Sequence, residues 1–134
     1  AIRYLQKSLR VDEQNSAIHL LMDTAFRQSG QFQAANNSLM TAIQLRLAEG
    51  VNNQNSIETT NMADLLVERT KRKNLDAVQL AVECYAAAYQ RKKAAAAASL
   101  GAKLARSQKQ IQLAESLDQL AKHYLNEKDD HLSR

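Results

Sequence analysis

The sequence predicts an all-α protein of about seven helices, paired as antiparallel hairpins and stacked into an α-solenoid. Its 134 residues contain no proline, no tryptophan and only three glycines, whereas the tight turns of a sheet protein usually need glycine or proline. The abundant residues, among them Ala, Leu, Gln, Lys, Arg and Glu, are strong helix formers. Apolar residues also recur at helical spacing along most of the chain. Because this length is enough to bury one core, we expect a single domain over residues 1–134.

The first half of the chain predicts a regular helical hairpin. A helix is expected at residues 16–29, with Asn15 or Ser16 as its N-terminal cap. Gly30 is expected to end this helix, because glycine adopts the left-handed conformation at little steric cost. Phe32 then begins the next helix and is expected to pack into the hairpin. A preceding helix is expected over residues 1–15. Its residues 1–11 repeat the small or apolar character of residues 35–45 at an offset of 34; the matched pairs are Ala1 with Ala35, Leu5 with Leu39, Ser8 with Ala42, Leu9 with Ile43, and Val11 with Leu45.

This 34-residue period of two antiparallel helices resembles the tetratricopeptide repeat (TPR) family. The family pattern has a large residue, a leucine–small pair and an aromatic on the first helix, then a glycine turn, a second aromatic and two alanines. The matching residues are His19, Met22, Phe26, Gly30, Phe32, Ala35 and Ala42. Asp23 departs from the pattern at the small position, and Glu13 and Leu47 replace the proline that usually follows the second helix. The resemblance is clearest over residues 1–48.

The second half of the chain predicts four further helices but leaves their pairing open. They are expected at residues 57–72, 75–90, 94–107 and 111–126, after a polar loop at 52–56, with Asn74 ending the first and residues 91–93 forming a turn. In one register, Tyr89 is the first aromatic of a degenerate repeat, residues 92–93 replace the turn glycine, and Ala98 and Ala105 are the small positions. In the other register, the helices at 57–72 and 75–90 form a hairpin. We therefore divide the domain into a regular region (1–50), degenerate hairpins (55–127) and a polar tail (128–134).

The alanine-rich tract at residues 94–102 is expected to be a helix rather than a disordered linker. Alanine has the highest helix propensity, and its small side chain lets neighbouring helices approach closely.

The TPR resemblance implies that the chain is a scaffold for protein–protein interaction. In this family the first helix of each repeat lines a concave groove that takes a peptide or helix of a partner. The outward-facing residues of the first helix are the predicted partner contacts, although some of them can instead pack on a neighbouring repeat: Ala17, Leu20, Thr24, Arg27 and Gln28. Some family members clamp acidic tails with lysine and asparagine, but the matching positions here hold Leu20 and Thr24, which argues against that clamp in this repeat.

Nucleic acid is the second candidate partner, because the formal net charge is +4. The candidate phosphate contacts lie in two clusters: Arg69, Lys71, Arg72 and Lys73, and Arg91, Lys92 and Lys93. The alternative is that both clusters lie at helix C-termini, where the helix dipole favours cations. No aromatic residues alternate with them to stack on bases, which ranks nucleic acid behind a protein partner. Self-association through apolar surface on the terminal helices is a third hypothesis.

The sequence contains no motif that predicts an enzyme. No nucleophile elbow, phosphate-binding loop, dinucleotide fingerprint or HExxH zinc motif occurs. Cys84 is the only cysteine and lies on a predicted buried stripe, so we expect neither a disulfide nor a catalytic thiol. We predict no cofactor, no metal site and no membrane partner, and the single free cysteine with no visible signal peptide favours the cytoplasm.

Overall fold

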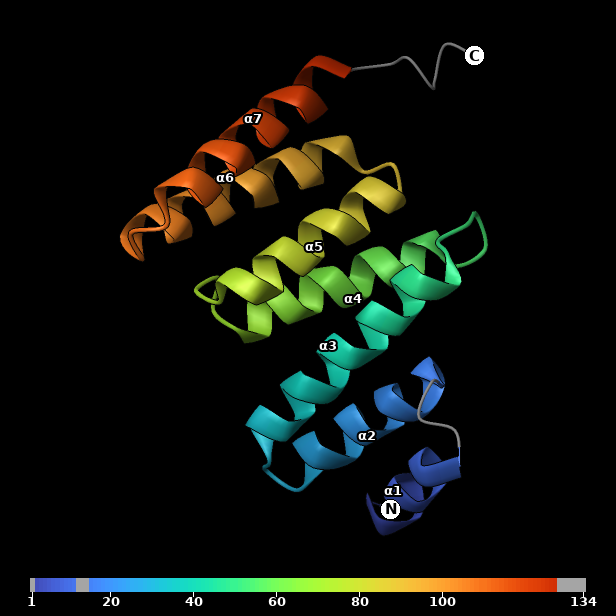
Figure 1. Cartoon of the computed structure of the whole chain (residues 1–134). Helices are drawn as coiled ribbons and strands as arrows, with labels where there is room; N and C mark the ends of the chain where they lie inside the picture. Colours follow the sequence, from blue (N-terminus) through green and yellow to red (C-terminus); the bar gives the residue numbers. More distant parts are fainter. Residues whose placement is uncertain (1, 12–14, 128–134) are drawn as a thin grey trace.

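The computed structural model describes residues 2–11 and 15–127, and this part of the chain is all-helical, which confirms the predicted fold class (Figure 1). Its seven helices are α1 (Ile2–Val11), α2 (Ser16–Gln28), α3 (Phe32–Glu49), α4 (Ser56–Arg69), α5 (Leu75–Ala87), α6 (Arg91–Ser107) and α7 (Ile111–Glu127). The predicted tail at 128–134, Ala1 and Glu13 lie outside the described residues. So do the side chains of Leu5, Ser8, Leu9 and Val11, on which part of the expected repeat depends.

The helices stack in chain order, and successive helices from α2 to α7 run in alternating directions. Within the described residues, every pair of helices in backbone contact is consecutive along the chain, except α3 and α5. Figure 1 shows α3, α5 and α7 running parallel to one another, each beginning at the left and ending at the right. Elements that contact mainly their neighbours in sequence are the basis of an α-solenoid.

The first hairpin forms largely as the sequence predicts. The Oδ1 atom of Asn15 caps α2 by accepting from the backbone N–H groups of Ala17 at 2.9 Å and Ile18 at 3.3 Å. Gly30 has a φ of 78° and ends the helix. Ala35 is fully buried against Met22 and Phe26, so α2 and α3 pack closely at this point.

The prediction that Phe32 packs into the hairpin is wrong. Its side chain is 65% exposed, because Phe32 is the first residue of α3 and lies at the turn, while Met22, Phe26 and Ala35 fill the space between the helices.

Three of the interhelical turns share one backbone geometry, although only the first contains glycine. Gly30, Tyr89 and Lys109 all have left-handed φ values, of 78°, 59° and 61°. A glutamine follows each of them, and its backbone N–H donates at 2.8 Å to the carbonyl five residues earlier, while its own carbonyl accepts from the N–H of an alanine four residues later. The three glutamines are Gln31, Gln90 and Gln110, and the three alanines are Ala35, Ala94 and Ala114, all fully buried. This pattern is a Schellman C-cap that leads directly into the next helix.

This turn geometry corrects the predicted boundaries in the second half. Arg91 begins α6, so residues 91–93 are not a turn, and Tyr89 takes the position that Gly30 has in the first hairpin. Tyr85, which is buried as Phe26 is, therefore corresponds to the first aromatic of the hairpin. Asn74 does not end α4 but caps α5, because its Oδ1 atom accepts from the Ala77 N–H at 3.0 Å.

We expect opposite effects from substitutions at two of these turns. Gly30→Ala should lower the free energy of unfolding by about 1 kcal/mol, because an L side chain is disfavoured in the left-handed region. No atom lies within 4 Å of a Cβ added there, so the cost comes from the backbone alone. Lys109→Gly should raise the same quantity, by up to about 1 kcal/mol. Urea unfolding followed by circular dichroism measures both, and a loss of stability in Lys109→Gly would contradict the turn assignment.

The core lies along the centre of the stack. Its largest fully buried side chains include Leu39 and Ile43 of α3, Leu66 of α4 and Val78 of α5. The alanine-rich tract forms most of α6 and is buried on one face, which confirms the predicted close-packed helix. The buried residues of this face are Ala94, Ala95, Ala97, Ala98, Gly101, Ala102 and Ala105.

Candidate binding groove between α3 and α5

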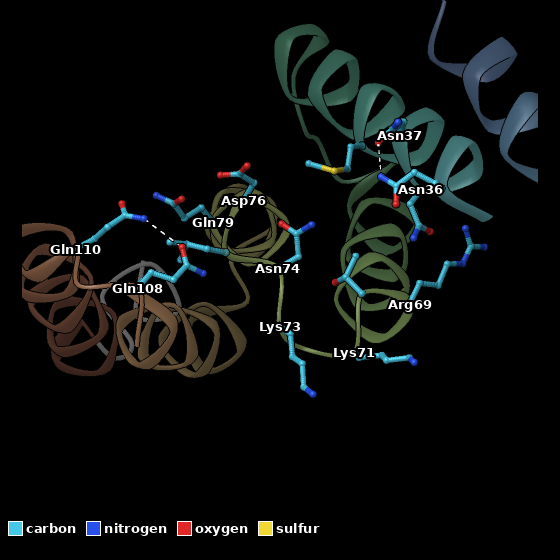
Figure 2. A pocket seen from close by; sticks show the side chains of 14 residues that line it. Asn36, Asn37, Arg69, Lys71, Lys73, Asn74, Asp76, Gln79, Gln108 and Gln110 are labelled. Atoms are coloured by element: carbon cyan, nitrogen blue, oxygen red, sulfur yellow. Dashed lines mark hydrogen bonds between the residues drawn. The ribbon is translucent and has the colours of Figure 1, made fainter. Parts of the chain in front are cut away.

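A groove of about 690 Å³ in the described part of the chain is lined mainly by polar side chains (Figure 2). The first half of α3, the α4–α5 turn, the start of α5 and the α6–α7 turn all contribute to it. Seven of its lining residues are amides: Gln33, Asn36, Asn37, Asn74, Gln79, Gln108 and Gln110. Figure 2 shows the asparagines of α3 on one side, Gln108 and Gln110 on the other, and Asn74 between them.

A second cavity of about 440 Å³ continues this groove along the same two helices. Met40, Asp76 and Gln79 line both cavities, so the two are contiguous. The remaining residues of the second cavity are Gln44, Leu47, Leu80 and Glu83. We call the two cavities together the α3–α5 groove.

Arg69 lines the groove and is held by an ion pair that reaches across two helices. Its Nη1 atom donates to Oδ1 of Asp23 at 2.6 Å, and both side chains are largely buried. The same carboxylate oxygen lies 3.6 Å from Nε of Arg27. Asp23, which departs from the small residue of the TPR pattern, thus links α2 to the end of α4 and fixes one wall of the groove.

The α4–α5 turn presents basic side chains from a strained backbone. Lys71 and Arg72 have φ values of 56° and 58°, and two successive non-glycine residues in this region are unfavourable. Lys71 and Lys73 are exposed and contribute to the lining of the groove, and in Figure 2 their side chains extend away from Asn36 and Asn37 of α3. Backbone strain of this kind is concentrated at binding and catalytic sites, so it supports the turn as part of a candidate site.

The five residues of α2 that the sequence predicts as partner contacts do not line the α3–α5 groove. Ala17, Thr24, Arg27 and Gln28 are exposed, whereas Leu20 is half-buried against the central core. Gln28 lines a separate cavity together with residues of α1. Their role as partner contacts stays a prediction.

The seven predicted phosphate contacts lie on more than one surface. Arg69, Lys71 and Lys73 line the α3–α5 groove, while Arg72 and Lys93 line a separate cavity of about 180 Å³. Arg91 and Lys92 lie in the first turn of α6. The structure therefore does not bring the seven residues into one continuous stripe.

The setting predicted for the second basic cluster, a helix C-terminus, is wrong. The residues begin α6, where the helix dipole disfavours cations. Asp64 compensates for this in part, because its Oδ2 atom lies 3.0 Å from Nζ of Lys93. The same ammonium group lies 5.7 Å from the centre of the Tyr85 ring, within the range of a cation–π interaction.

Cys84 and Tyr85 are buried and stay protonated at neutral pH. Burial, with a smaller contribution from the nearby Glu83 carboxylate, raises the pKa of the Cys84 thiol to about 12. Burial also raises the pKa of Tyr85, as does the hydrogen bond that its hydroxyl donates to Asp64. Cys84 packs in the central core, which confirms its predicted place on a buried stripe.

Comparison of the chain with models of protein families, with curated proteins and with solved structures finds no match. The TPR resemblance accordingly stays a prediction, and function has to be argued from geometry. In residues 2–11 and 15–127, no helix is long and apolar enough to cross a membrane. Nor do three His, Cys, Asp or Glu side chains of this region gather as they would around a metal ion.

Polar stripes on α3 and α5 are the sequence signal for the α3–α5 groove. Gln33, Asn37 and Gln44 are polar residues at helical spacing on α3, and Asp76, Gln79 and Glu83 follow the same spacing on α5. Both stripes are readable from the sequence. The TPR pattern predicts partner contacts on the first helix of the hairpin, whereas the α3–α5 groove lies against the second.

Proposed function

We propose that this chain is a non-enzymatic protein-interaction scaffold that binds an extended peptide segment of a partner protein in the α3–α5 groove. The observation that carries this proposal is one continuous groove, lined by amides, along two parallel helices.

Amide side chains suit the backbone of an extended peptide. Each Asn or Gln side chain offers both donors and an acceptor, as each peptide unit does, and an extended segment leaves its own N–H and C=O groups unpaired. Some groove amides already bond to one another, as Gln33 does to Asn37 at 3.5 Å and Gln110 to Gln108 at 3.2 Å. Since each amide can make up to four hydrogen bonds, these contacts leave other positions for a ligand.

The groove also offers an apolar floor on rigid supports. Met40, Leu47 and Leu80 line it and pack against the central core. The backbone that carries these side chains is already ordered in helices, so binding does not have to order it, which favours affinity. An extended peptide can therefore gain hydrogen bonds at its backbone and apolar contacts at alternate side chains.

The two other hypotheses have less support. Asp76 and Glu83 place negative charge along the groove, which opposes a polyanion such as RNA. The exposed face of α7 is mainly polar; the exposed polar residues of this helix include Gln112, Glu115, Ser116, Gln119 and Lys122. A polar face favours binding of a separate partner over self-association through that end of the stack.

Selection from a displayed library of random peptides tests the proposal. Gln79→Trp should block the groove at the junction of its two cavities, whereas Gln119→Trp, on the exposed face of α7, is the matched control. We expect peptides that bind the natural chain and Gln119→Trp but not Gln79→Trp, with both variants folded by circular dichroism. Enriched peptides that bind all three proteins equally, or no enrichment, would overturn the proposal.

A further inference from the structure

The α3–α5 groove carries opposite charges at its two ends. Lys71 and Lys73 line the end at the α4–α5 turn, and Glu83 lines the other end. Asp76 lies where the two cavities meet. We propose that the groove selects a peptide whose charges are segregated, with acidic side chains at the α4–α5 turn and basic side chains near Glu83. This inference rests on the proposed function and adds the charge pattern of the partner.

The lysines of the turn are the cations that a ligand meets. Arg69 also lines the basic end, but its Nη1 atom is held by the buried carboxylate of Asp23 and its Nη2 atom is itself buried. Lys71 and Lys73 are exposed, and the left-handed φ of Lys71 is a conformation that would favour glycine. A basic side chain is present at that position despite the backbone cost.

The helix dipoles do not set the polarity of the groove. α3 and α5 begin at the basic end, and Gln110, just before α7, lines the same end. The N-terminal end of a helix carries about half a positive charge, but α4 and α6 end there, with Thr70 and Gln108 as their C-terminal caps, and their C-terminal ends carry the opposite partial charge. The polarity of the groove therefore comes from its side chains, with the two lysines of the turn at one end and Glu83 at the other.

The dimensions of the groove fit a short extended segment. Leu75 and Glu83 both line the groove and are about 12 Å apart along α5, given a rise of about 1.5 Å per residue. An extended chain covers that distance in about four residues, at about 3.3 Å each. Leu47 and Leu80 line the groove towards the Glu83 end, so the centre of the segment should be apolar.

Four synthetic peptides of eight residues test the charge pattern. All have a Gly-Leu-Leu-Gly centre, two glutamates and two lysines, and hence the same net charge. Two are segregated, with both glutamates at one end and both lysines at the other, in each chain direction. Two are interleaved, with one glutamate and one lysine at each end. We expect the better segregated peptide to bind about three- to tenfold more tightly than either interleaved one, as measured by fluorescence anisotropy, since exposed ion pairs are individually weak.

A double charge reversal assigns this preference to the groove. Lys71→Glu with Lys73→Glu should reduce the affinity for the segregated peptide to that for the interleaved peptides. Lys103→Glu with Lys122→Glu makes the same change in net charge on exposed lysines outside the groove and should leave the preference intact.

The possible outcomes separate the inference from the proposed function. Equal binding of all four peptides, abolished by Gln79→Trp, would overturn the charge inference and leave the peptide groove in place. Failure of every peptide to bind would overturn both. Binding of a single-stranded oligouridine more tightly than any peptide, lost on reversal of Lys71 and Lys73, would also overturn both.

Discussion

Asp23→Ala should lower the free energy of unfolding by about 3–5 kcal/mol, the range typical of breaking a buried ion pair. Asp23 is only 3% exposed, and its carboxylate accepts from Arg69 at 2.6 Å. The arginine side chain is 14% exposed, so removal of the carboxylate leaves a guanidinium group largely shielded from water without its counter-ion. Urea unfolding followed by circular dichroism measures the loss.

Asp118→Ala is the matched control. Asp118 pairs with Arg106, but both side chains are well exposed, at 39% and 49%, and the expected loss is below about 1 kcal/mol. A second variant separates the ion pair from packing. Asp23→Leu combined with Arg69→Met should recover most of the lost stability, because apolar groups can replace a buried pair at little cost. If Asp23→Ala is no more damaging than Asp118→Ala, the pair does not hold α2 to α4.

The helices themselves could largely be predicted from the sequence, because helix formation depends on local patterns. Gly30 and the apolar spacing on α2 were enough to place the first hairpin. Residue propensity does not predict the turn at Tyr89, because a tyrosine rarely adopts a left-handed φ and the surrounding helices impose this conformation. A local signal does exist. At Gly30, Tyr89 and Lys109, a glutamine follows the left-handed residue, and an alanine comes four residues after that glutamine.

The groove could not be predicted in the same way, because it depends on how the hairpins stack. Asn36 and Gln110 line one cavity although they are far apart in the chain. Asp23 departs from the repeat pattern, but its partner Arg69 lies 46 residues away, and no local spacing connects them. Long-range contacts of this kind determine which face of the stack is hollow.

Gly101→Leu should destabilise the second half of the stack by about 3 kcal/mol, near the upper end of the usual cost of overpacking. Gly101 is buried in α6, and even a single Cβ added there would lie 3.1 Å from Cδ1 of Leu117 and 3.4 Å from Cγ1 of Val78. Those side chains belong to α7 and α5, so a leucine would force both neighbouring helices away from α6. Urea unfolding gives the loss of stability, and hydrogen exchange should show that α5, α6 and α7 are the helices affected.

A graded series distinguishes this close approach from a general intolerance of α6. Gly101→Ala should change stability much less, because the gain in helix propensity, about 1 kcal/mol, opposes the tight contact with Leu117. Lys103→Leu adds the same side chain on the exposed face of α6 and should stay within about 0.5 kcal/mol of the natural chain. Equal effects of the two leucine substitutions would contradict the packing of α6 between its neighbours. A large effect at Gly101 alone would mean that small residues set the distance between the last three helices, and with it the position of the α6–α7 turn against the groove.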